Sequence, residues 1–149
     1  MAQHALPNAD TYNSSGYSDQ TGLKTSLYTK VDESYATYND ADFVRSPLGP
    51  ASSVYVFKLN PVEDPVIHTG HIIKYRYGKG IAGGGQIDLT VQLRQGYVNE
   101  GSPGTLIHSE AHTNISDSWT YGTFTLTAGE AATITNYSDL HVRLVANQI

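Results

Sequence analysis

The chain has 149 residues, of which 39% are hydrophobic and 15% are charged. Its 9 Lys and Arg residues against 14 Asp and Glu residues give a formal net charge of −5. This balance argues against a nucleic-acid partner, because a general nucleic-acid binder needs a basic surface that displaces the counterions of phosphates. It argues equally against a polybasic membrane anchor. The absence of cysteine excludes disulfides, zinc thiolates and cysteine nucleophiles.

Length and composition favour one β-rich domain. A chain of this length fits a single domain, and 11 Tyr with 14 Gly are typical of strands joined by turns. The N-terminus contains no apolar segment of the kind found in secretion signals. No apolar run approaches the roughly 20 residues of a membrane span. We therefore expect a soluble protein, made in a cytoplasm, with no membrane partner.

Residues 1–26 show neither helical nor strand periodicity and are rich in Asn, Ser, Asp, Gly and Tyr. This composition predicts an irregular N-terminal arm that becomes ordered on the surface of the domain or on another chain. Its large side chains, and a tyrosine just beyond it, are the candidate anchors for a partner. These candidate partner-binding residues are Leu6, Tyr12, Tyr17, Leu23 and Tyr28.

Residues 27–149 are predicted to form the folded domain, and the first part of this domain shows only weak hydrophobic periodicity. Leu27, Val31 and Tyr35 have helical spacing, but the Thr, Ser, Asp and Tyr content of residues 27–50 favours irregular chain with short strand pieces. Tyrosines crowd the N-terminal third of the chain. Because tyrosine is large and amphipathic, this crowding favours an interface, with a sugar-stacking surface as the alternative.

Strand signals become clear after Pro50. Runs rich in β-branched and aromatic residues, several of them alternating apolar and polar, are separated by turn signals every 8 to 12 residues or so. This spacing predicts an all-β fold, an antiparallel β-sandwich, with a jelly roll as the expected specific topology. The predicted strands are residues 53–60, 71–78, 86–94, 105–113, 119–127 and 140–146.

The alternation also predicts which side chains form the core. Every second residue of a strand points to the same face, so the apolar members of each run are expected to be mostly buried. The predicted core residues are Ile73, Tyr75, Ile87, Leu89, Val91, Leu93, Phe124, Leu126, Leu140, Val142 and Leu144.

Motifs that could carry chemistry are few. The glycine-rich residues 78–85 lack the Gly-Lys-Ser/Thr and following helix of a phosphate-binding loop, so we interpret them as a hairpin loop. No G-x-S-x-G elbow occurs. Acidic pairs could bind calcium or act as glycosidase carboxylates, but solvated loop acids are the simpler interpretation. These pairs are Asp32 with Glu33, Asp40 with Asp42, and Glu63 with Asp64.

Two histidine pairs are candidate metal ligands. His68 and His71 are three residues apart, and on a strand that spacing directs side chains to opposite faces. His108 and His112 could share a face, with Glu110 nearby. We expect ordinary surface or loop histidines, no metal site, no cofactor, no catalytic residues and no enzymatic activity.

Six segments together resemble small β-sandwich proteins of tailed-bacteriophage virions, the type that decorates or cements the icosahedral head. The resemblance covers about residues 27–146 and implies no individual functional residue. It implies a structural role on the virion, with the major capsid protein as partner and a homotrimer as the assembled state. A neck, tail or fibre component, a carbohydrate-binding β-sandwich and, least favoured, a hydrolase or lyase remain open. The segments are 27–33 (LYTKVDE), 39–44 (NDADFV), 59–65 (LNPVEDP), 89–93 (LTVQL) with Gly96, 119–121 (WTY) and 134–144 (ITNYSDLHVRL).

Overall fold

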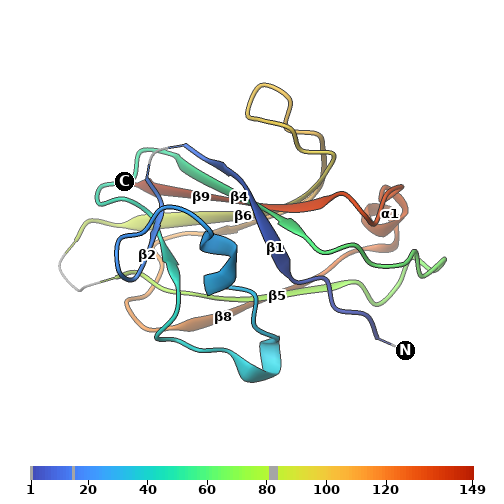
Figure 1. Ribbon diagram of the computed structural model, residues 1–149, viewed down its shortest axis with the longest axis horizontal. Helices are drawn as coiled ribbons and strands as arrows, with labels where there is room; N and C mark the ends of the chain where they lie inside the picture. The colour runs from blue at the N-terminus through green and yellow to red at the C-terminus, as the bar shows by residue number, and fades with distance from the viewer. Residues whose placement is uncertain (1, 15, 81–83) are drawn as a thin grey trace.

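The larger layer of the protein is a five-stranded antiparallel sheet with the order β1-β4-β9-β6-β7 (Figure 1). The computed structural model describes residues 2–14, 16–80 and 84–149. The strands of this sheet are β1 (Pro7–Asn13), β4 (Ser53–Leu59), β6 (Ile87–Gln95), β7 (Thr105–His112) and β9 (Leu140–Gln148).

A two-stranded antiparallel layer packs against this sheet and completes the sandwich. It consists of β5 (Ile72–Tyr77) and β8 (Thr120–Thr125), which lie below the large sheet in Figure 1. The short strands β2 (Ser18–Asp19) and β3 (Val44–Arg45) form a third pair. The helical segments are η1 (Leu27–Lys30), η2 (Tyr35–Thr37) and α1 (Ala128–Ala132).

The predicted all-β fold and all six predicted strands are confirmed, with ends that shift by one or two residues. The jelly roll, a fold of eight strands in two sheets, stays a prediction. The hairpin interpretation of residues 78–85 is wrong, because β5 pairs with β8 whereas β6 pairs with β7 and β9, so the strands on either side of this segment lie in different layers. Its residues 81–83 lie outside the described part of the chain. Sequence alternation identifies strands but not which strand each one joins.

The main core lies between the two layers and follows the predicted alternation. Four predicted residues, Ile73, Tyr75, Leu89 and Leu144, are half-buried and pack against it. Ile87 is half-buried. Tyr17, Leu27, Tyr55 and Phe57 are buried there without having been predicted. The predicted residues that are buried are Val91, Leu93, Phe124, Leu126, Leu140 and Val142.

A second, smaller core lies on the outer face of the large sheet. Val54 and Val56 of β4 are buried there together with Tyr97, which belongs to the loop that follows β6. Tyr12 and Val145 pack against this cluster. Strand β4 is therefore buried on both faces. Its sequence is accordingly a nearly continuous apolar run and does not alternate.

The prediction that residues 1–26 form an irregular arm is wrong for residues 7–13, which form strand β1, and for the short strand β2. Strand β1 is the edge strand of the large sheet and pairs along its length with β4, with two register shifts. Asp10 fixes this strand by accepting hydrogen bonds from the Tyr55 hydroxyl at 2.7 Å and from the backbone N–H groups of Leu27 and Tyr28. Because backbone and polar side-chain contacts hold this strand, it does not need the alternating apolar side chains by which a core strand is recognised in a sequence.

Within the described residues, no helix has the length and apolar character needed to cross a bilayer.

Candidate functional site

The outer face of the β5–β8 layer carries the most distinctive exposed surface of the described residues. Because strand residues alternate, Ile73, Tyr75 and Tyr77 turn toward the core, whereas Lys74 and Arg76 turn outward. The pairing of β5 with β8 places Thr123 opposite Lys74 and Tyr121 opposite Arg76. Residues directly opposite each other share a face, so these four side chains occur on one surface.

Arg76 is the centre of this surface. Its guanidinium donates two hydrogen bonds to the Asp40 carboxylate, from Nε at 2.7 Å and from Nη2 at 2.6 Å. These hydrogen bonds raise the pKa of Arg76 above its ordinary value. The guanidinium carbon lies 4.1 Å from the ring centre of Tyr38 and 4.2 Å from that of Tyr121. Arg76 is thus held by one bidentate ion pair and two cation–π contacts.

Four large aromatic side chains around Arg76 remain accessible to solvent. Tyr35, Tyr38, Trp119 and Tyr121 keep between 41% and 48% of their surface exposed. Tyr121 packs edge-on with Tyr35 and Tyr38, at ring-centre distances of 5.6 and 5.7 Å, and its hydroxyl donates a hydrogen bond to that of Tyr38. We call these four rings, together with Lys74 and Arg76, the aromatic surface.

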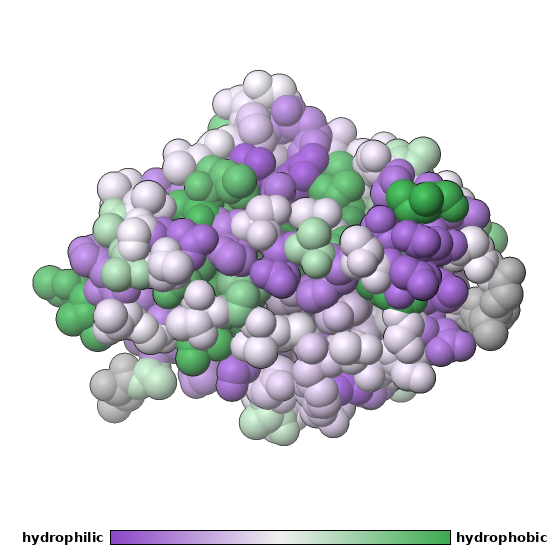
Figure 2. Space-filling view, turned by 180° about the vertical axis from the view of Figure 1, so that it is seen from behind, coloured by the Kyte–Doolittle hydropathy of each residue, from purple (hydrophilic) through white to green (hydrophobic). Residues whose placement is uncertain are grey.

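The hydropathy of this side of the molecule is intermediate. In Figure 2, which views the protein from behind, the lower half is mostly pale rather than strongly purple or green. Tyrosine, tryptophan and threonine side chains have this character, since each combines an apolar body with a polar group. Such surfaces are enriched in protein–protein interfaces.

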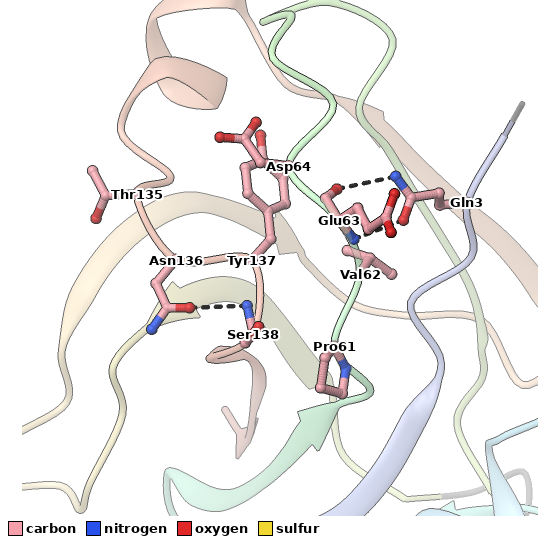
Figure 3. Close-up of a pocket in the computed structure, with 9 residues that line it drawn as sticks. All are labelled: Gln3, Pro61, Val62, Glu63, Asp64, Thr135, Asn136, Tyr137 and Ser138. Carbon is pink, nitrogen blue, oxygen red and sulfur yellow. Dashed lines mark hydrogen bonds between the residues drawn. The ribbon is translucent and has the colours of Figure 1, made fainter.

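A shallow depression of about 660 Å³, where the loop after β4 meets the segment before β9, is a weaker candidate (Figure 3). Several of its polar groups already bond within the chain. The Gln3 side chain exchanges two hydrogen bonds with the backbone of Glu63, and Asp64 accepts one from the backbone of Val66. Tyr137 shares a hydrogen bond of 2.8 Å with His71. The depression is therefore a junction of loops that tie one another down.

The histidines of β7 do share a face, and they contact the β5–β8 layer. His108 stacks on Phe124 with ring centres 4.2 Å apart and lies 2.7 Å from a carboxylate oxygen of Glu130 and 3.3 Å from one of Glu110. Burial alone would lower the pKa of His108, but these carboxylates outweigh burial and raise it. This histidine contributes to the contact between the layers.

The other two histidines of these pairs have different environments. His112 stacks on Tyr77 at 4.2 Å and shares a 2.6 Å hydrogen bond with the Tyr75 hydroxyl; burial lowers the pKa of His112. His68 is exposed in the loop before β5. Across residues 2–14, 16–80 and 84–149, no three His, Cys, Asp or Glu side chains group so that they could hold a metal ion.

The predicted partner-binding residues have different environments. Tyr17 is buried in the core, where its hydroxyl donates a hydrogen bond to the Ser53 carbonyl. Its side chain is therefore not accessible to a partner. Tyr12 packs beside Tyr97, Tyr28 packs against the main core and Leu6 is half-buried. Leu23 alone of the five is freely accessible, with 62% of its surface exposed. A role of these residues in binding a partner stays a prediction.

The aromatic surface was visible in the sequence only in part. Tyr35 and Tyr38 belong to the noted cluster of tyrosines, and the alternation of residues 71–78 already turns Arg76 outward. The ion pair between Arg76 and Asp40 joins residues 36 positions apart. It depends on the path of the chain between η2 and β5, which local pattern does not reveal.

Comparison with known proteins adds no family: no family model matches the chain, and no curated protein or solved structure matches it significantly.

Proposed function

We propose that the protein is a structural component of a tailed-phage virion, a head decoration protein that binds the major capsid protein and stabilises the shell. The resemblance of residues 27–146 to such proteins supports this role, as it supports a homotrimer as the assembled state. We further propose that the protein is not an enzyme. The observation that carries the binding role is the aromatic surface around Arg76.

The aromatic surface suits docking because its side chains are already ordered. Arg76 is fixed by Asp40 and by the rings of Tyr38 and Tyr121. Immobilising a flexible side chain on binding costs about 0.5–1.5 kcal/mol, so a pre-ordered surface loses less of its binding free energy to entropy. Tyrosine and tryptophan also provide large contact areas with few rotatable bonds.

Carbohydrate binding is the second candidate, and the exposed rings of Tyr35, Tyr38, Trp119 and Tyr121 are the observation that favours it. A sugar stacks on a free ring face. The ring faces that Tyr38 and Tyr121 turn toward Arg76 are occupied by its guanidinium, and Tyr35 has the Lys74 ammonium 4.6 Å from its ring centre. Protein docking is therefore the better supported use of this surface.

The location of the protein tests the proposal. Purified virions of the encoding phage are labelled with antibody against this protein and viewed by electron microscopy. Label over the head supports the proposal. Label confined to the neck, tail or fibres would transfer the protein to another virion part, and unlabelled virions that also lack the protein by mass spectrometry would contradict a structural role.

A second measurement separates sugar binding from protein docking. Trp119 is the only tryptophan of the chain and belongs to the aromatic surface, so its fluorescence reports directly on this site. Neutral and acidic oligosaccharides are expected to leave the emission unchanged. A saturable change with a sugar, lost in Tyr121→Ala, would favour the carbohydrate-binding function.

A further inference from the structure

We propose that the aromatic surface binds an extended acidic segment of the partner protein, whose carboxylates pair with Lys74 and Arg76. This inference rests on the proposed docking function and adds the chemistry of the partner.

The strands of the β5–β8 layer carry only positive charge in an acidic protein. Their sequences, IIKYRY and TYGTFT, contain one Lys and one Arg and no carboxylate, whereas the whole chain has a formal net charge of −5. Asp40, from a different segment, compensates Arg76, so Lys74 is the cation that this surface leaves uncompensated. Opposite potentials steer two surfaces together and fix their register.

Lys74 presents an unpaired cation at this surface. Its ammonium lies 4.6 Å from the ring centre of Tyr35, and the residue opposite it on β8 is the neutral Thr123. Among the described residues, no carboxylate lies within ion-pair distance of Lys74. The ring restricts the ammonium without neutralising it, which leaves its three N–H groups available to an incoming anion.

Arg76 keeps one arm of its guanidinium free. Asp40 accepts from Nε and Nη2, whereas Nη1 donates to no described residue. A guanidinium has five N–H donors in a rigid fork, so one carboxylate does not exhaust it. The Arg76 side chain keeps 13% of its surface exposed, so an anion that bonds to Nη1 must approach along this exposed edge while the ion pair with Asp40 stays intact.

The spacing of the two cations fits an extended peptide. Lys74 and Arg76 are two residues apart on one strand, which separates them by roughly 6.5–7 Å on the same face. Carboxylates two residues apart on an extended partner have the same separation. The rings of Tyr35, Tyr38, Tyr121 and Trp119 surround the cations, and they would contact the apolar parts of such a segment and exclude water from its carboxylates.

The test uses the full chain, labelled with ¹⁵N, and a synthetic peptide of alternating Thr and Glu as the probe. We expect saturable NMR shifts of the Trp119 indole and of β5 and β8 amides, which weaken as salt is raised. The isosteric Thr–Gln peptide should bind more weakly. Lys74→Gln should weaken binding by about 2- to 5-fold, the size of one exposed ion pair. Lys24→Gln, on the loop after β2, is the matched control and should leave it unchanged.

Three outcomes would overturn the inference: equal binding of the Glu and Gln peptides, unchanged binding by Lys74→Gln, or binding of an acidic oligosaccharide such as oligogalacturonate in place of the peptide. These failures are distinguishable from failure of the docking function. If the antibody labels the virion head while the peptide does not bind, docking stands and the acidic partner is wrong. If the peptide binds while virions lack the protein, the virion role is wrong.

Discussion

Each layer of the sandwich has an arginine–carboxylate pair set against tyrosine rings on its outer face, and the two clusters differ mainly in the exposure of these rings. On the large sheet, Arg143 donates to Glu100, which also accepts from the hydroxyl of Tyr97. On the small layer, Arg76 donates to Asp40 between Tyr38 and Tyr121. Tyr97 keeps 4% of its surface exposed, whereas Tyr121 keeps 48%.

The path of the covering loop explains this difference. The loop after β6 folds back over the large sheet, so Tyr97 and Glu100 close over Val54, Val56 and Arg143. In the other cluster, the segment around η2 brings Tyr35, Tyr38 and Asp40 to the edge of the small layer but leaves the rings in solvent. Tyrosine rings beside an arginine–carboxylate pair therefore stabilise the fold at one site and are available for contact at the other.

The largest expected effect is on stability at the cluster of Tyr97, Glu100 and Arg143, which the loop after β6 encloses. Tyr97→Ala removes a buried ring and leaves a cavity among Val54, Val56 and Tyr12, so it should lower the free energy of unfolding by about 3–5 kcal/mol. Urea unfolding followed by circular dichroism measures this loss. A loss below about 1 kcal/mol would show that the loop after β6 is not part of the folded core.

The two ion pairs should contribute similarly to stability. The side chains of Arg143 and Glu100 are 17% and 31% exposed, and those of Arg76 and Asp40 are 13% and 36% exposed. Glu100→Gln weakens charge-assisted hydrogen bonds to Arg143 and should cost about 1.5–3 kcal/mol, and Asp40→Asn should cost a comparable amount. Chemical denaturation of both variants under one condition gives the comparison, and a loss several-fold smaller for one variant than for the other would contradict it.

The ion pair between Arg143 and Glu100 should also make the free energy of unfolding depend on pH. Hydrogen bonds from Arg143 hold the pKa of Glu100 below its ordinary value of 4.5. A carboxylate whose pKa is lowered by folding stabilises the native state above the pKa of the unfolded chain, and this stabilisation is lost as pH falls through the lower, folded value. The stability difference between wild type and Glu100→Gln should therefore shrink below about pH 4.5. Unfolding curves at pH 7 and pH 3.5 measure it, and a constant difference would contradict the assignment.

The smallest expected effect on stability is at the aromatic surface. Tyr121→Ala removes a ring that is half in solvent, so the free energy of unfolding should fall by less than about 1 kcal/mol. Thermal and urea unfolding beside Tyr97→Ala provide the measurement. A loss as large as that of Tyr97→Ala would show that the aromatic surface serves the fold.

The sequence revealed those parts of the molecule that rest on apolar alternation. Leu93 and Val142 were predicted to be buried because their strands alternate cleanly, and they are. Strand β1 was missed because polar contacts such as those of Asp10 hold it, and such contacts leave no periodic signal. The centre of the candidate site was missed for a related reason, since the pairing of Arg76 with Asp40 depends on tertiary structure.

Attachment of a double variant to the shell tests most directly whether the aromatic surface is the docking surface. Capsid shells of the encoding phage, assembled without this protein, are mixed with wild type or with Trp119→Ala/Tyr121→Ala, after circular dichroism has shown that the variant is folded. Sedimentation with the shells and cryo-electron microscopy then give the occupancy. We expect wild type to saturate its sites and the double variant to remain largely unbound. Undiminished occupancy by the folded double variant would contradict the account.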